Sequence, residues 1–405
     1  MINVSVLGYG TVGSGVVEVL KENQKTIEAK TGKKICVKHV LDLRDFPGDP
    51  VQDIITHDFA DVVNDDEVSI VVETMGGLHP AYEFVKQALE SGKHACTSNK
   101  ALVAAYGPEL LQIAREKNVN FLFEASVGGG IPIIRPLQTA LASDAIEEIS
   151  GILNGTTNYI LTKMTNEGSD FDTVLKEAQA KGYAEANPEA DVEGHDTCRK
   201  IAILTSLAYG KTVNFEDIHT EGITKITDSD ILYAKKLGAK IKLFGSSKSE
   251  GDKVSAMVAP VLIKEGHPLF NVDDVFNGIL VKGNMVGDLM FYGSGAGKLP
   301  TAAAVVSDVI DAAMHVDENI HVNWADEKLE LTPVDEVAYR FFVRAAGDKT
   351  ANAAKAAEAF GKVEEVDAGV ADEYAFVTDV ITEGAYKAAE EKMGNVINKI
   401  RIMYE

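Results

Sequence analysis

The first 124 residues alternate short apolar runs with helical patterns of apolar residues. The runs cover residues 2–7, 35–41, 69–72, 94–97 and 120–124. Apolar residues at Val16, Leu20 and Ile27 predict a helix after the first run, and residues 82–90 predict a helix after the third. Strands that alternate with helices are typical of a doubly wound parallel sheet, so we expect an α/β domain of Rossmann type over residues 1–134.

The rest of the chain predicts two further domains. Strands near 149–153 and 254–262 alternate with helices, which indicates an α+β domain over residues 135–298. A polar stretch at 318–333 is expected to be a linker, and residues 334–405 then predict the order βαββαβ of a ferredoxin-like module. The strands of this module are expected at 339–344, 363–366, 374–381 and 396–403, and its helices at 351–360 and 385–393.

The charge of the chain points to small molecules as partners. The 405 residues include 62 acidic and 39 basic side chains, a formal net charge of −23, which would repel nucleic acids and anionic membranes. Three scattered cysteines indicate neither a disulfide framework nor a cysteine zinc site. The chain shows no leader pattern and no apolar run of roughly 18 residues. A soluble cytoplasmic protein is therefore expected.

A glycine-rich turn follows the first expected strand. Gly8, Gly10 and Gly13 have the G-x-G-x-x-G spacing, with Thr11 and Val12 at the start of the helix. Glycines at these positions allow a tight turn, close approach of the backbone to a pyrophosphate, and packing of the helix on the strand. A purely structural turn is the alternative, but the strand before and the helix after favour dinucleotide binding.

Polar residues follow other expected strands, at the edge of the sheet where a cofactor would lie. Asp42 ends the second strand and could accept hydrogen bonds from the adenosine ribose, which favours NAD. Arg44 is close enough in sequence to bind a 2′-phosphate, so NADP stays open. Thr74, Ser98 and Lys100 follow two further strands, and ligands of such sheets bind beyond the carboxyl ends of the strands.

A second glycine-rich segment suggests a cation site. Glu124 ends an expected strand and precedes Gly128, Gly129 and Gly130. Curled backbone turns carbonyl oxygens inward, and together with a carboxylate they suit a hard cation such as sodium. A flexible hinge between domains is the alternative interpretation.

The segment 181–200 carries the clearest catalytic chemistry. Glu185 and Asp191 lie on an expected loop, and Asp196 and Lys200 stand four residues apart on the helix that follows, so they share one face. Together they predict an acidic pocket with a proton-carrying ammonium group. The alternative is an ordinary solvated ion pair on a helix surface.

Two other enzyme classes are disfavoured. A P-loop at 293–298 would need a glycine at Tyr292 and a serine or threonine at Leu299. A phosphorylating semialdehyde dehydrogenase would need an activated cysteine, and nothing marks Cys96 or Cys198 as a nucleophile.

Together these motifs resemble the homoserine dehydrogenase family over roughly residues 1–320. The likeness rests on GYGTVG at residue 8, SNK at 98, EASVGGGIP at 124, GILNGTTNYIL at 151, GYAEANPEADVEGHDTCRK at 182 and GSGAGKLPTA at 293. The resemblance implies interconversion of L-homoserine and L-aspartate 4-semialdehyde with NAD or NADP, a step shared by threonine and methionine biosynthesis. It also implies that an apolar helix near 299–320 completes the nucleotide-binding domain. We expect a homodimer or homotetramer, formed through the domain at 135–298.

The resemblance assigns roles to individual residues. Lys200 matches the family's proton-donating lysine and Glu185 its substrate-binding glutamate, while Asp191 and Asp196 match carboxylates that hold the substrate and orient that lysine. The remaining matches are Lys100 at the junction of cofactor and substrate, Thr156 and Tyr183 in the substrate pocket, Gly297 near the cofactor, and Glu124 with the backbone oxygens of Val127, Gly129 and Ile131 as the monovalent cation site.

The C-terminal module resembles ACT modules, which bind amino acids at a paired interface. Residues 345–350 lack the expected Asp-x-Pro-Gly turn, so feedback by threonine and a purely structural or dimer-forming tail both stay open. A non-catalytic sensor of nucleotide and amino acid is the second functional hypothesis. It would need neither Lys200 nor its carboxylates.

Overall fold

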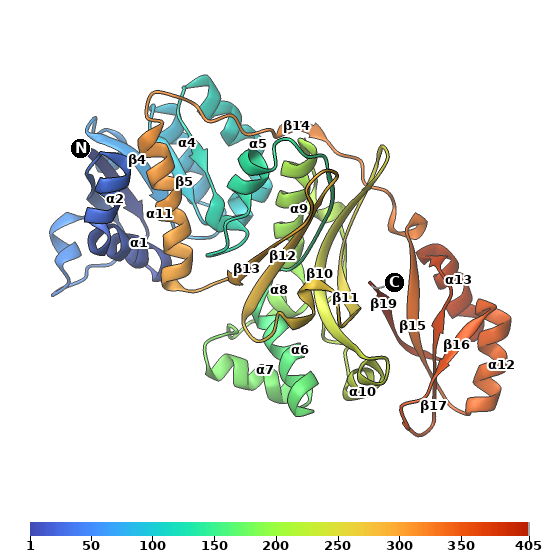
Figure 1. The fold of residues 1–405 in the computed structure, drawn as a ribbon. Coiled ribbons are helices and arrows are strands. Elements are labelled where there is room, and N and C mark those ends of the chain that lie inside the picture. The colour runs from blue at the N-terminus through green and yellow to red at the C-terminus, as the bar shows by residue number, and fades with distance from the viewer. Residues whose placement is uncertain (404–405) are drawn as a thin grey trace. The chain divides into compact units, whose positions relative to one another are not determined.

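The computed structural model describes residues 1–403, and the chain folds into two compact units, whose elements can be followed by colour in Figure 1. Unit 1 comprises residues 1–145, 202–214 and 293–329, and unit 2 comprises residues 146–201, 215–292 and 330–405. Within residues 1–403, no helix has the length and apolar character needed to cross a membrane.

Unit 1 is built on a six-stranded parallel sheet in the order β3-β2-β1-β4-β5-β6. The strands are β1 (Ile2–Leu7), β2 (Ile35–Leu41), β3 (Ile55–Thr56), β4 (Val68–Glu73), β5 (His94–Thr97) and β6 (Phe121–Leu122). The helices are α1 (Thr11–Glu22), α2 (Gln24–Thr31), α3 (Ala60–Val63), α4 (Ala81–Glu90), α5 (Lys100–Glu116) and α11 (Lys298–Met314). The predicted doubly wound parallel sheet is confirmed. Because β1 lies between β2 and β4, the strand order reverses at β1, which is where such sheets bind their ligands.

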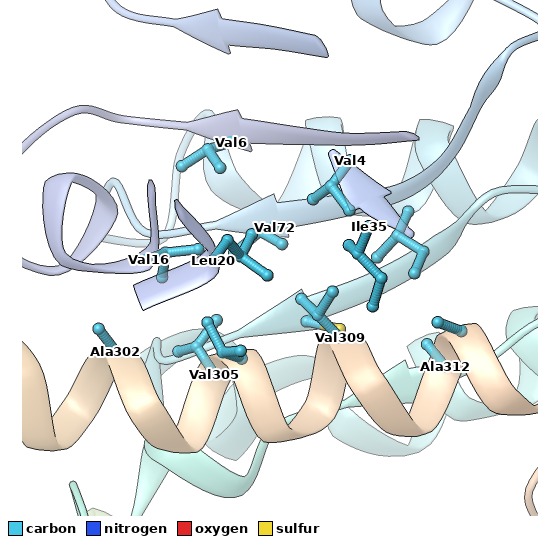
Figure 2. Close-up of a cluster of buried hydrophobic side chains, with 14 of the residues drawn as sticks. Val4, Val6, Val16, Leu20, Ile35, Val72, Ala302, Val305, Val309 and Ala312 are labelled. Atoms are coloured by element: carbon cyan, nitrogen blue, oxygen red, sulfur yellow. The ribbon is translucent and has the colours of Figure 1, made fainter. Parts of the chain in front are cut away.

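Helix α11 covers one face of this sheet, as Figure 2 shows. Its apolar residues recur three or four positions apart, so they form one stripe directed at the sheet. The stripe consists of Ala302, Val305, Val309 and Ala312, and it packs against Val4, Val6, Ile35 and Val72 of the sheet and Val16 and Leu20 of α1. Burying each valine side chain contributes roughly 1.5–3 kcal/mol, so the stripe holds α11 firmly in the core of the N-terminal strands.

Three expected elements of unit 1 differ from the prediction. The helical pattern through Ile27 is interrupted at Asn23, a residue of low helix propensity, and forms two helices. The strand expected at 120–124 pairs only over β6, because the Glu124 N–H donates to the Asp308 carboxylate at 2.8 Å and the chain turns away from the sheet. The expected linker contains β14 (Ala325–Lys328), which pairs in parallel with β8 (Lys211–Thr212).

Unit 2 is built on a mixed sheet in the order β13-β12-β7-β10-β11-β19-β15-β17-β16. Its first strands are β7 (Ile146–Ile152), β9 (His219–Thr220), β10 (Ala239–Glu250), β11 (Lys253–Lys264), β12 (Phe276–Gly283) and β13 (Gly287–Ser294). Its first helices are α6 (Gly155–Glu167), α7 (Phe171–Ala180), α8 (Glu189–Val192) and α10 (Asp228–Lys236), and α9 (His195–Tyr209) begins here. The predicted second α+β region therefore has a mixed sheet.

Residues 338–402 follow the predicted order βαββαβ with one additional short strand, β18. The elements are β15 (Ala338–Ala346), α12 (Lys349–Phe360), β16 (Val363–Val366), β17 (Glu373–Thr378), β18 (Ile381–Thr382), α13 (Glu383–Met393) and β19 (Val396–Ile402). The strand expected at 374–381 is divided between β17 and β18, which both pair with β15. Because β19 also pairs with β11, this segment continues the sheet of unit 2, and its separation as a third domain stays a prediction.

Buried ion pairs join this segment to the rest of unit 2. Arg401 of β19 has no exposed surface, and its guanidinium donates to Glu383 and Glu221 at 2.8–2.9 Å. Arg344 of β15 donates to Asp230 of α10 at 2.7 Å. A buried arginine without its carboxylate partners is costly, so these pairs favour one arrangement of the module on the sheet.

Candidate active site

The chain after β1 forms a turn that requires glycine. Gly8 has φ +91°, a conformation that side chains disfavour, and a Cβ on Gly13 would lie 1.8 Å from the Gly8 carbonyl oxygen. Thr74 Oγ1 donates to the same oxygen at 2.9 Å and thereby joins the ends of β1 and β4. Gly10, in contrast, has open space around the position of a Cβ. Thr11 begins α1, whose first N–H groups have no intrahelical partner, so this turn can receive a pyrophosphate.

The Asp42 carboxylate uses its hydrogen-bonding capacity within the chain. Arg44 donates Nε to Oδ1 at 2.9 Å and Nη2 to Oδ2 at 3.0 Å, and the Tyr9 N–H donates to Oδ2 at 2.8 Å. The bonds from Arg44 lower the pKa of Asp42 to about 2. The Arg44 side chain is 63% exposed and that of Asp42 only 9%, so the cation is the more accessible member of the pair.

A buried carboxylate that the sequence analysis missed joins two loops at this edge. Glu73 ends β4, and its Oε1 accepts the N–H groups of Met75 at 2.7 Å and Gly76 at 3.2 Å. Its Oε2 accepts the Thr97 hydroxyl at 2.5 Å, and Thr97 accepts the N–H of Asn99, the N-cap of α5. Burial raises the pKa of Glu73. An acidic residue ending an apolar run was the signal that could have identified it.

The other expected cofactor residues lie at the starts of two helices of unit 1. Ser98 and Lys100 flank the N-cap of α5, and both are partly buried. Gly297 precedes α11 with φ +118° and is exposed. Only glycine adopts this conformation readily.

The Glu124 carboxylate caps a turn of its own unit. Oε1 accepts the N–H groups of Ile133 at 2.6 Å and Ile134 at 2.7 Å, and Oε2 accepts that of Arg135 at 2.7 Å. Val127 and Ile131 lie in the same buried loop. Three of about four lone-pair positions of the carboxylate are therefore filled by the chain. Within residues 1–403, no group of three or more His, Cys, Asp or Glu side chains is arranged to hold a metal ion.

In unit 2, Lys200 and Asp196 form a buried pair on the first turns of α9. Lys200 Nζ lies 2.8 Å from Asp196 Oδ2 and donates to the Leu153 carbonyl oxygen at 2.7 Å. The side chains are 10% and 5% exposed. The interpretation as a solvated surface pair is therefore wrong. The i,i+4 spacing was read correctly, but the spacing does not reveal the burial of the pair or its bonds to Leu153 and Asn154.

Asn154, a second residue that the sequence analysis left out of the site, connects the carboxylates. As the N-cap of α6, its Oδ1 accepts the Thr157 N–H at 2.8 Å. Its Nδ2 donates to Asp191 Oδ1 at 2.8 Å and to Asp196 Oδ2 at 3.0 Å. An asparagine at the end of an apolar strand and before a helix is the N-cap signal that could have identified it.

The other residues expected to bind the substrate lie on the loop between α7 and α8 and at the start of α6. Thr156 is buried and donates its hydroxyl to the Tyr183 carbonyl oxygen at 2.6 Å. The Tyr183 ring is 44% exposed and meets the Tyr159 ring edge-on. Glu185 is exposed, and within residues 1–403 only its backbone oxygen, held by Gln179, has a hydrogen-bond partner. Direct bonds thus gather Asp191, Asp196 and Lys200, but not the Glu185 carboxylate.

Both buried cysteines are poor nucleophiles. Cys96 and Cys198 are 0% and 5% exposed, and burial raises the pKa of each thiol. A raised thiol pKa disfavours the reactive thiolate. This agrees with the expectation that neither cysteine is a nucleophile.

A parallel sheet with a glycine turn at its switch point defines a dinucleotide-binding α/β protein. A buried lysine held by one carboxylate and one carbonyl oxygen is a group suited to proton transfer in a dehydrogenase. Comparisons with known proteins give the family. The family model for the NAD binding domain of homoserine dehydrogenase matches residues 8–124, and the model for homoserine dehydrogenase itself matches residues 132–310. The chain belongs to the homoserine dehydrogenase family, and it is an NAD(P)-dependent oxidoreductase.

Proteins named homoserine dehydrogenase match most of the chain. A homoserine dehydrogenase of Bacillus subtilis is 43% identical over 84% of this chain and 80% of its own length, and one of Synechocystis is 44% identical over 85% and 82%. The crystal structure of a homoserine dehydrogenase from Thiobacillus denitrificans has a TM-score of 0.91 at 38% identity, covering 99% of this chain and 98% of that one. A hyperthermophilic archaeal homoserine dehydrogenase in complex with NADPH has a TM-score of 0.66 at 28% identity, covering 77% and 98%.

Proposed function

We propose that the chain interconverts L-homoserine and L-aspartate 4-semialdehyde, with Lys200 as the proton donor and acceptor. The observation that carries this proposal is the burial of Lys200 Nζ between Asp196 Oδ2 and the Leu153 oxygen. The nicotinamide cofactor supplies or accepts the hydride when it is bound. In alcohol oxidation the neutral amine takes the hydroxyl proton as the C4 hydride leaves, and in reduction the ammonium returns that proton to the aldehyde oxygen. Asp196 is proposed to hold the amine in place.

An absorbance assay separates this function from a non-catalytic sensor. Homoserine with NAD or NADP at alkaline pH should produce reduced nicotinamide at a rate proportional to enzyme concentration. Alkaline pH favours the direction that releases a proton. Binding of both ligands without turnover would favour the sensor instead.

We expect Glu185→Ala to raise the homoserine KM by about 10-fold or more, with little change in kcat. Residues 1–403 offer the Glu185 carboxylate no hydrogen-bond partner, so it is available to the substrate ammonium group. A hydrogen bond to a charged group contributes roughly 1.5–3 kcal/mol. Initial rates over a range of homoserine concentrations measure the effect. Glu189→Ala, which removes another exposed carboxylate of the same segment, is the control and should leave KM unchanged. An unchanged KM in Glu185→Ala would reject its role.

We propose that Arg44 decides the preference between NAD and NADP. Arg44 is exposed and covers the Asp42 oxygens, an arrangement that suits a 2′-phosphate better than a ribose diol. In Arg44→Ala the cation is lost and Asp42 becomes available to the ribose. The ratio of kcat/KM with NADP to kcat/KM with NAD should therefore fall by about 10-fold or more, as for loss of a charged hydrogen bond. An unchanged ratio would leave Arg44 without a part in the choice.

The cation site is proposed to use the main chain. Glu124 has one carboxylate lone pair left after its three N–H bonds, so the backbone oxygens of Val127, Gly129 and Ile131 would supply most ligands to a sodium ion. Replacing sodium by tetramethylammonium at constant ionic strength should lower activity if the site is occupied during turnover.

We propose that the C-terminal segment is an ACT-type module without threonine feedback. Its βαββαβ order supports the module, and the loop at 345–350 lacks the turn expected of an amino-acid site. Inhibition by threonine at millimolar concentrations would contradict the lack of feedback.

The proposed homodimer finds support at β13, an edge strand of its sheet within the described residues. It exposes Met290 and Tyr292, and Tyr292 stacks on the exposed Phe276. Sedimentation velocity of the full chain measures the subunit number.

A further inference from the structure

Asn154 connects the Asp191 and Asp196 carboxylates to the start of helix α6. Its two amide hydrogens go to Asp191 Oδ1 and Asp196 Oδ2, and its oxygen accepts the N–H and the hydroxyl of Thr157. The side chain is buried, with 6% of the residue exposed. All of the main hydrogen-bonding positions of this amide are therefore used, and none is used by solvent.

The chemistry of the amide fixes the hydrogen-bonding role of the oxygens that it contacts. An amide NH₂ group only donates, so both carboxylate oxygens that it contacts must act as acceptors. Two carboxylates that share one nitrogen at 2.8 and 3.0 Å lie close enough to repel each other, and the two amide hydrogens between them offset that repulsion. The same Asp196 oxygen pairs with Lys200 Nζ, and the residue before Asn154 supplies the carbonyl that binds Nζ from another direction. The end of β7 thus orders both acceptors of the lysine.

We infer that Asn154 is a positioning residue for proton transfer, because it sets the separation of Asp191 and Asp196 and through Asp196 the direction of Lys200. This inference rests on the proposed role of Lys200. A residue that only capped α6 would need an acceptor atom and nothing more. Aspartate and serine are caps about as good as asparagine, but neither can donate to two carboxylates at once.

The substitutions Asn154→Asp and Asn154→Ser separate capping from positioning. Both keep an acceptor for the Thr157 N–H, and both remove the NH₂ group. We expect kcat for homoserine oxidation to fall by 10-fold or more, as for one charged hydrogen bond, with the cofactor KM unchanged. The fall in kcat should be larger in Asn154→Asp than in Asn154→Ser, because the aspartate adds a third carboxylate beside Asp191 and Asp196. The matched control exchanges one cap for another at the next helix, Asp170→Ser, where the side chain accepts the Thr173 N–H and touches no site residue.

The test measures kcat and Tm of the full-length Asn154 variants, and Lys200→Ala is measured beside them. Wild-type kcat in both Asn154 variants, with Lys200→Ala inactive, would overturn the inference and leave the proposed function standing. Wild-type kcat in Lys200→Ala would remove the proposed role of the lysine and the inference together. A large fall in Tm in both Asn154 variants but not in Asp170→Ser would make Asn154 a structural residue and would also overturn the inference.

Discussion

Replacing Lys200 by alanine is expected to lower kcat for homoserine oxidation by about 10²–10⁴-fold, the range that general acid–base catalysis supplies. The substrate hydroxyl then has no base at the position that Nζ occupies between Asp196 and the Leu153 oxygen. The cofactor KM should change little, because the glycine turn and Arg44 belong to unit 1 and Lys200 belongs to unit 2. Steady-state rates with both substrates varied measure the two effects separately.

Lys200→Arg is the matched variant for this experiment. Arginine keeps the positive charge and the bonds to Asp196 but does not give up its proton in the working pH range. It should therefore be almost as inactive as the alanine variant, which would show that proton transfer and not charge alone is lost. A near-normal rate in either variant would remove Lys200 from the mechanism.

Gly10→Ala is expected to raise the cofactor KM by about 10-fold or more without changing the Tm. Its Cβ would meet no atom of residues 1–403 within 4 Å, and Gly10 has φ −86°, outside the left-handed region that favours glycine. The space is open in the protein but lies where the second glycine of this motif admits the pyrophosphate. Thermal unfolding without cofactor and initial rates with varied cofactor give the two readouts.

Gly13→Ala provides the contrast, because its Cβ would lie 1.8 Å from the Gly8 oxygen. The turn must shift, and overpacking of this kind costs typically 1–3 kcal/mol, so this variant should lose both Tm and cofactor affinity. If Gly10→Ala bound the cofactor as well as the wild type, the pyrophosphate would not approach this glycine.

Local patterns predicted most elements of unit 1 and the spacing of the proposed catalytic pair. The strand before Gly8 and the helix after Gly13 follow from apolar runs and periodicity, and the position of Asp196 and Lys200 on one face follows from a helical spacing of four. Each of these inferences needs only residues that are close in the sequence.

The features that the sequence analysis did not predict depend on contacts between residues far apart in the sequence. The Lys200 pair is bonded to the Leu153 oxygen and to Asn154, which lie more than forty residues earlier in the chain, and Glu73 accepts the Thr97 hydroxyl of the neighbouring strand. The pairing of β14 with β8 joins segments more than a hundred residues apart and has no local pattern. Propensity and periodicity carry no information about such partners, so only the fold reveals them.

The most direct test of the account is a crystal structure of the full chain with the nicotinamide cofactor and homoserine bound. The account predicts Lys200 Nζ within hydrogen-bond distance, about 2.6–3.2 Å, of the C4 hydroxyl oxygen, with Asp196 still bound to the amine. An amine remote from that oxygen, with another group in its place, would contradict it.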